Sequence, residues 1–150
     1  YSRIFKGKDA KQWSRLVMSK YLTSIALIAA GLGPLLLDIG ATHLLNPDWD
    51  AHARVHEVWR LSTNSLITML GLYLLWIKQR EFLAALLSLC LLIGFWISVF
   101  LMPFYGGLPV GNGIDELAPL GIPLNIFSFV VVLLIQILGL ILLKSDHKSI

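Results

Sequence analysis

Four runs of apolar residues, separated by short polar connections, dominate this sequence. They cover about residues 21–45, 61–77, 82–104 and 123–143. A helix needs about 20 mostly apolar residues to cross the hydrocarbon core of a bilayer. The runs therefore predict an all-α integral membrane protein, a bundle of four transmembrane helices in which residues 1–150 form a single domain.

The composition agrees with lipid as the surrounding solvent. Hydrophobic residues make up 57% of the chain and charged residues 14%, whereas soluble domains average about 45–50% and about 25%. The net charge of +3 does not indicate nucleic acid as a partner, because the basic residues stand in blocks at the ends of apolar runs. The chain has one cysteine, so it forms no intrachain disulfide.

Lysine and arginine residues are concentrated on one side of the predicted bundle. Those on that side are Arg3, Lys6, Lys8, Lys11, Arg15, Lys20, Lys78, Arg80, Lys144 and Lys148. The other side has only Arg54 and Arg60. The positive-inside rule then places both termini in the cytoplasm. It places the loops of about residues 46–60 and 105–122 in a bacterial periplasm or an organelle lumen. The short connection 78–81 predicts a tight antiparallel hairpin of the second and third spans.

Three of the four histidines, His43, His52 and His56, fall on the non-cytoplasmic side. Asn46 followed by Pro47 is a favoured pair at a helix start, so we expect a helix that begins at Pro47 and runs into the second span. On that helix His52 and His56 share a face. Two histidines at this spacing can chelate a transition metal.

Acidic residues near the histidines extend this hypothesis. A third nitrogen from His43, or an oxygen from Asp38 or Glu57, would complete a metal site. Asp38 follows three leucines, and an ionisable group inside a span indicates a functional site. The alternative is that Asp38 lies at the membrane interface, paired with Arg54 or Arg60. The histidines, too, have a structural alternative: they cap helix ends or lie at headgroup level.

The second non-cytoplasmic connection is rich in glycine and proline and fairly apolar. We expect it to fold back over the bundle as a lid. Its acids, Asp115 and Glu116, then either reach the histidines or are solvated.

Several short motifs, in the same order along the chain, resemble styrene oxide isomerase, a small four-span enzyme that converts epoxides to carbonyl compounds. The resemblance covers about residues 43–129. The matching residues are His43, Pro47, Trp49, Ala53-Arg54-Val55-His56, Gly94-Phe95 and Ile126-Phe127-Ser128-Phe129. The stretch also resembles small uncharacterised membrane proteins of bacteria and fungi, through His43, Asn46, Pro47, Trp49, His52 and His56. That resemblance implies no activity.

The resemblance to the isomerase implies that His56 ligates haem b, whose iron acts as a Lewis acid on the epoxide oxygen. An asparagine and a tyrosine assist in that family. Asn64 is the nearest asparagine, two residues further along than the family spacing. Trp96 stands in the tyrosine's place, which leaves Tyr105 as a substitute, and Asp38 is a further catalytic candidate.

The preferred hypothesis is thus a membrane-embedded isomerase of a small hydrophobic substrate that arrives through the lipid. A second hypothesis replaces haem with a single non-haem transition metal, held by His43, His52 and His56 with Asp38 or Glu57. A third is a non-catalytic accessory or lipid-binding subunit. For so small a bundle we also expect a homo-oligomer.

Overall fold

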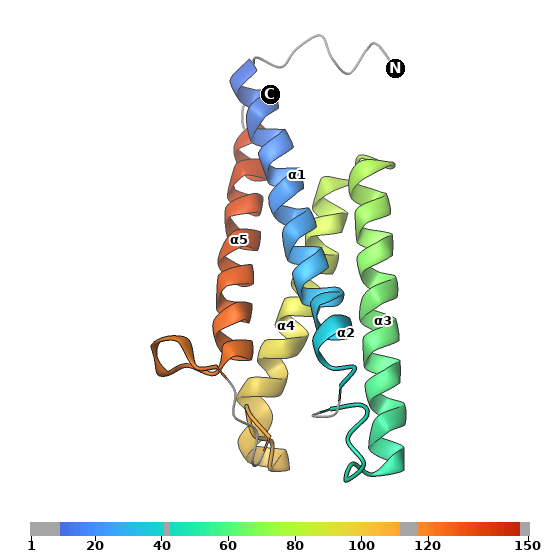
Figure 1. The fold of residues 1–150 in the computed structure, drawn as a ribbon. Helices are drawn as coiled ribbons and strands as arrows, with labels where there is room; N and C mark the ends of the chain where they lie inside the picture. The colour runs from blue at the N-terminus through green and yellow to red at the C-terminus, as the bar shows by residue number, and fades with distance from the viewer. Residues whose placement is uncertain (1–9, 41–42, 112–116, 148–150) are drawn as a thin grey trace.

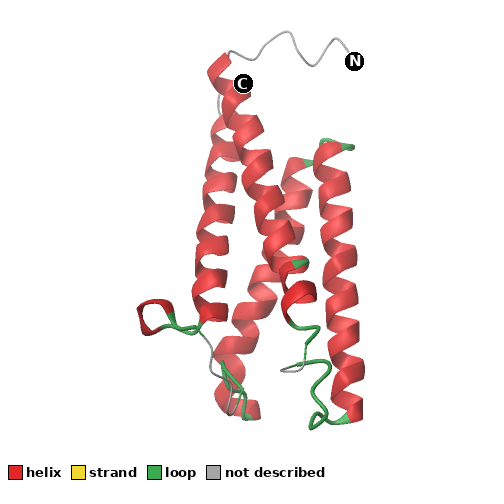
Figure 2. Ribbon diagram, in the orientation of Figure 1, coloured by secondary structure: helices red, strands yellow, loops and turns green. Residues whose placement is uncertain are grey.

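The computed structural model describes residues 10–40, 43–111 and 117–147, and this part of the chain is helical, with no strand. The elements are α1 (Ala10–Gly31), α2 (Gly33–Leu37), α3 (Ala51–Trp76), α4 (Glu81–Tyr105), the 3-10 turn η1 (Pro119–Gly121) and α5 (Leu124–His147). Four long helices lie side by side, and the short α2 follows α1 (Figure 1). Apart from the turn at Leu32 between α1 and α2, the loops lie at the two ends of the bundle (Figure 2). The predicted all-α bundle is confirmed in this respect.

The bundle has two distinct ends. The start of α1, the end of α5 and the connection between α3 and α4 lie together at one end, here called the terminal end (Figure 1). Residues 38–50, the start of α3 and the connection between α4 and α5 lie at the opposite end, here called the histidine end (Figure 1). The up-down order of the helices agrees with the topology expected from the apolar runs.

Small residues and hydrogen bonds between helices hold the centre of the bundle. α1 packs against α5, α3 and α4, and α4 packs against α3 and α5, so that α3 and α5 are the outer helices. Leu27, Leu91 and Leu92 belong to the buried core. Oγ1 of Thr68 donates to the carbonyl oxygen of Leu27 at 3.1 Å, which ties α3 to α1. Such short-range packing and hydrogen bonding are what associate helices in lipid, where burial of apolar surface drives little.

Three segments of the described chain are long and apolar enough to cross a membrane: α1 with α2 (residues 10–37), α4, and α5 as far as Lys144. α3 does not reach the same hydropathy, because its first half carries three charged residues and several hydroxyl and amide side chains. It is nevertheless as long as its neighbours and lies alongside them (Figure 1).

The first apolar run, expected to be helical over about 21–45, forms a helix with different limits. α1 begins earlier, at Ala10, and ends at Gly31, and α2 ends at Leu37. Pro34 has no N–H to continue the helical hydrogen bonds of α1. The backbone N–H of Asp38 donates to the carbonyl of Pro34 at 2.8 Å, which closes the last turn of α2.

The helix expected to begin at Pro47 instead begins at Ala51, with Asp50 as its N-cap. Oδ1 of Asp50 accepts hydrogen bonds from the backbone N–H groups of His52 and Ala53, at 2.8 and 3.3 Å. Asp50 thus satisfies donors that a helix start leaves free. The side chain of Asn46 is used locally, because its Oδ1 accepts from the N–H of Asp48 at 2.9 Å.

The tight connection between α3 and α4 is confirmed. α3 ends at Trp76 and α4 begins at Glu81. Gln79 has a left-handed backbone, with φ of 54°, and the N–H of Arg80 donates to the carbonyl of Leu74 at 2.8 Å. The reversal brings the two helices together as antiparallel neighbours.

Candidate functional site

At the histidine end, Arg54 organises the loop that precedes α3. Its Nη2 donates to the carbonyl oxygens of Asn46, Pro47 and Trp49 at 2.8, 3.1 and 3.2 Å. The three carbonyl groups belong to no helix or strand, and the guanidinium of Arg54 supplies a hydrogen bond to each of them. The loop is therefore fixed relative to the first turns of α3, which carry the histidines.

His52 and His56 form a close pair on α3. Their Nε2 atoms lie 3.0 Å apart, and their rings are nearly perpendicular. Both side chains are exposed, and the ring of His56 stacks on Trp59 with centroids 6.2 Å apart. Asp50 is the N-cap of α3 and fixes the residue at which the helix begins. His52 and His56 therefore both lie in its first two turns. The predicted one-turn spacing on one helix face is confirmed.

Asp38 and Glu57 do not turn towards the histidine pair in this structure. Both carboxylates are bound by the guanidinium of Arg60, and Nε of Arg60 donates to Oε2 of Glu57 at 3.0 Å. Asp38, at the end of α2, is therefore paired with Arg60, which is one of the two partners expected for it. Burial alone would lower the pKa of Arg60. The hydrogen bonds and charges of Glu57 and then Asp38 outweigh that effect, so its pKa is raised.

A guanidinium with a raised pKa stays charged across the physiological range. The contribution of the Arg60 charge is fully present below its ordinary pKa and is lost as the pH rises through the higher value of the folded state. Arg60 thus connects α3 to the end of α2 with a charge that does not change over the physiological range.

His43 lies in the loop, half-buried, with its ring 5.9 Å from that of Trp49. Over the described ranges, no three histidine, cysteine, aspartate or glutamate side chains are grouped so as to hold a metal ion. The structure therefore brings together His52 and His56, and separately Asp38 and Glu57. It does not gather His43 with the pair into the expected set.

The other residues suggested by the isomerase resemblance lie on α3 and α4. Asn64 is half-buried on α3, and its backbone carbonyl oxygen faces Gly31 of α1. The hydroxyl of Tyr105 donates to the carbonyl of Ser98 at 2.8 Å, within α4. Nε1 of Trp96 is buried and has no hydrogen-bond partner.

The connection between α4 and α5 is described only in part, and Asp115 and Glu116 lie outside the described residues. Nδ2 of Asn125 donates to the carbonyl of Pro109 at 2.6 Å. The N–H of Leu124 donates to the carbonyl of Leu117 at 3.0 Å. These two bonds attach the described parts of the loop to the start of α5.

A buried polar cluster at the terminal end was not expected from the sequence. Nζ of Lys20, on α1, donates to Oε1 of Gln79 and lies 3.2 Å from Oε1 of Glu81. Trp76 places its ring 5.8 Å from the same ammonium, and its Nε1 donates to Oγ of Ser24 at 2.9 Å. In the sequence, Lys20 indicates only the topology. Glu81 is the first residue of α4, on the side of the bundle where the basic residues gather. An acid among these basic residues is the signal that could have predicted its pairing with Lys20.

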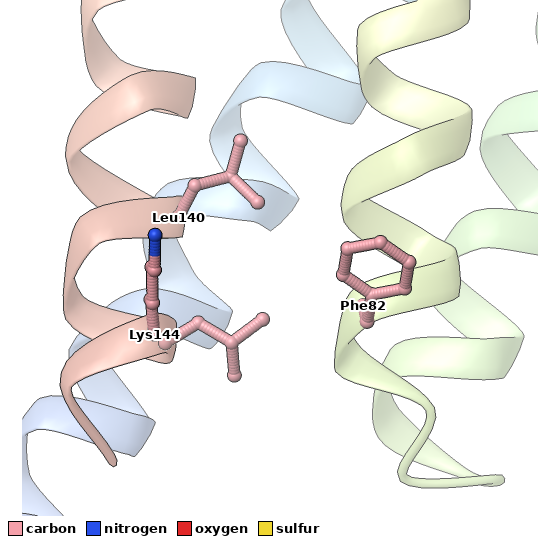
Figure 3. Close-up of a pocket in the computed structure, with 4 residues that line it drawn as sticks. Phe82, Leu140 and Lys144 are labelled. Carbon is pink, nitrogen blue, oxygen red and sulfur yellow. The ribbon is translucent and has the colours of Figure 1, made fainter. Parts of the chain in front are cut away.

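The terminal end also has an apolar cavity of about 390 Å³ between α4 and α5. Phe82 of α4 faces Leu140 and Lys144 of α5 across it (Figure 3), and Leu143 completes the lining. A lysine at the rim of an apolar groove suits the boundary between acyl chains and headgroups.

No family model matches this sequence, and neither a curated protein nor a solved structure matches it.

Proposed function

We propose that the protein spans a membrane with four helices, with both termini in the cytoplasm and the histidine end in a periplasm or lumen. The support is the charge distribution. Lys11, Arg15, Lys78, Arg80 and Lys144 all belong to the terminal end. Positive charge near span ends is retained on the cytoplasmic side. α3 would be the fourth span. It is long enough to cross a membrane, and it lies alongside helices that are apolar enough to do so.

The function that the geometry supports best is a membrane-embedded enzyme that uses a transition-metal ion bound by His52 and His56. The observation that carries this proposal is the Nε2–Nε2 distance of 3.0 Å. Two nitrogens bound to one ion at about 2.1 Å lie about 3.0 Å apart at a right angle and about 3.4 Å apart in a tetrahedron. The separation of the two nitrogens therefore already suits a shared metal ion, which would replace the hydrogen bond once both rings turn their Nε2 lone pairs towards it.

The surroundings of the pair suit a hydrophobic substrate. Val55 is 60% exposed beside the histidines, so an apolar molecule dissolved in the bilayer meets an apolar surface there. A bound metal ion would act as a Lewis acid on a substrate oxygen. The chain's own contributions are to hold the ligands on a capped helix, and to fix the adjacent loop through Arg54 and the end of α2 through Arg60.

A second candidate is the isomerase with haem b at His56, and one observation favours it: the exposed ring of His56 lies beside the flat, exposed face of Trp59. A macrocycle would have room there. However, the positions next to an axial ligand of haem iron are filled by the four nitrogens of the macrocycle. His52 would therefore have to turn away from His56 before haem is bound. The chelated ion keeps the two nitrogens at their present separation and is the preferred proposal.

Metal analysis and a UV–visible spectrum of the detergent-purified protein test both candidates. The matched variants are His52→Ala, His56→Ala and, as a control outside the pair, His43→Ala. Stoichiometric metal that is lost in the first two variants and kept in the control supports the chelated ion. A Soret band that is lost in His56→Ala and kept in His52→Ala supports haem.

If protein produced with haem and metals supplied shows neither signal, both cofactor proposals are wrong. The non-catalytic accessory or lipid-binding subunit would then be the best account of the chain.

A further inference from the structure

α3 exposes a regular stripe of side chains along its whole length. Among the many exposed positions of α3 and its C-cap, eight follow one another in alternating steps of four and three residues: His52, His56, Trp59, Thr63, Leu66, Leu70, Tyr73 and Ile77. This 3.5-residue period is the spacing of the buried seam in a left-handed pair of helices. Here the seam faces away from the rest of the chain. We call these eight residues the α3 seam.

Lipid is a poor match for the half of this seam nearer the histidine end. Thr63 is exposed there, and Ser62 beside it is exposed as well. α3 as a whole is not among the segments apolar enough to cross a membrane. It is also an outer helix, packed only on its inner side against α1, α2 and α4 (Figure 1). A helix with these properties is better covered by protein than by acyl chains.

The histidine pair is incomplete as a metal site. It supplies two nitrogen ligands, and no third histidine, cysteine or acidic side chain of the described chain is grouped with it. Zinc and copper sites built from histidine usually have three or four protein ligands. His52 and His56 are the first two positions of the α3 seam, so whatever covers the seam also faces the pair.

We propose that the α3 seam is the interface with a second copy of this chain, and that the two copies share one metal ion with four histidine ligands. An ion that takes five or six ligands would keep a position there for the substrate oxygen of the proposed function. Two copies inserted with the same topology can pair α3 with α3 only in parallel, about a two-fold axis along the membrane normal. In a parallel seam, equivalent positions meet across the axis. His52 and His56 of one chain then face the same residues of the second copy. The four-histidine site rests on the proposed metal function, whereas the seam itself rests on the spacing and exposure of α3.

Disulfide cross-linking in native membranes tests the seam. Leu66→Cys on α3 and Leu134→Cys on α5 form a matched pair, because the two leucines are 63% and 60% exposed. Both are made in a Cys90→Ser background so that the new thiol is alone. After mild oxidation, the expected result is a disulfide-linked dimer for Leu66→Cys and, at the neighbouring seam position, for Leu70→Cys, with monomer for Leu134→Cys. No dimer at either seam position, or equal dimer at Leu134→Cys, would overturn the seam.

The metal content of the same preparations separates the two proposals. A shared site predicts about one ion for every two chains, lost in His52→Ala and His56→Ala. Cross-linking at the seam without bound metal would keep the interface and overturn the metal function. One ion per chain without cross-linking would keep the metal function and overturn the shared site.

Discussion

Nζ of Lys20 lies 3.2 Å from Oε1 of Glu81, and this ion pair joins α1 to the first residue of α4. The side chains are 9% and 20% exposed, so the pair is largely shielded from water. It also fixes the turn before α4, because the same ammonium is bonded to Gln79. The pair thus connects the α3–α4 hairpin to α1 at the terminal end.

Replacement of one partner of this pair should destabilise the bundle. In Lys20→Met the carboxylate of Glu81 would be left partly buried without its cation, and breaking such a pair costs on the order of 3 kcal/mol. Thermal or SDS-induced unfolding in detergent measures the change. The double variant Lys20→Met/Glu81→Gln removes both charges and should recover much of the loss. Lys78→Met, at an exposed lysine 5.5 Å from the ring of Tyr73, should cost less than about 1 kcal/mol. Equal losses in Lys20→Met and Lys78→Met would contradict the assignment.

The contact of α1 with α3 depends on the absence of a side chain at Gly31. A Cβ atom there would lie 1.8 Å from Oγ1 of Thr68 and 3.0 Å from the carbonyl oxygen of Asn64. Thr68 cannot move freely, because its hydroxyl is bonded to Leu27. Gly31→Ala should therefore push the helices apart and reduce stability by about 1–3 kcal/mol.

Gly33→Ala is the matched control, since a Cβ at Gly33 meets nothing within 4 Å. It should leave the unfolding midpoint unchanged or slightly raised. Thr68→Ala in the Gly31→Ala background removes the clashing hydroxyl and should restore part of the loss. If Gly31→Ala alone unfolds like the parent protein, the two helices do not approach as closely as described.

Much of the fold could be predicted because hydropathy and charge act over whole segments. The turn at Lys78–Glu81 was predictable because four residues between two long apolar runs allow only a hairpin. The start of α3 was not, because Asn46 and Asp50 are both good caps. Which of them acts is decided by the path of the loop, and Arg54 holds that path through contacts that no local pattern specifies.

The candidate site divides in the same way. The pairing of His52 with His56 follows from helix geometry alone and was predicted. The place of His43 against Trp49, and the capture of Asp38 by Arg60, depend on residues 38–50, which form no regular element. The sequence indicates Arg60 only as one of two possible partners of Asp38. The two residues are more than twenty positions apart, and only tertiary packing brings them together.

Arg54 should be the residue on which the loop before α3 depends. Nη2 alone donates to the three carbonyls. The ammonium of a lysine keeps the charge but lies one bond closer to Cα, so it stops short of them. Hydrogen bonds from charged groups contribute roughly 1.5–3 kcal/mol each, so Arg54→Lys should raise hydrogen exchange of residues 46–50 by about tenfold or more. Arg60→Lys is the control, as Arg60 contacts α2 and not this loop. Unchanged exchange in Arg54→Lys would show that the loop is held by other contacts.

Ser88 of α4 and Gln136 of α5 are buried polar residues inside the bundle. Phe95 of α4 and Phe129 of α5 stack with ring centroids 3.7 Å apart. Because the two helices are antiparallel, seven residues from each ring, two helical turns, lead to Ser88 and Gln136 at a common level. Both side chains are fully buried, and neither Oγ of Ser88 nor the amide nitrogen and oxygen of Gln136 has a hydrogen-bond partner.

An unpartnered amide in such a place destabilises the fold by about 1–3 kcal/mol. Gln136→Leu, which keeps most of the volume, should therefore raise the free energy of unfolding by a similar amount. Ser19→Ala is the control with the opposite sign. Ser19 is buried too, but its hydroxyl donates to the carbonyl of Gly139 at 2.7 Å, so its removal should cost about 1 kcal/mol. A loss of stability in Gln136→Leu equal to that in Ser19→Ala would mean that the amide is hydrogen-bonded in the folded protein, to water or to a polar ligand between α4 and α5.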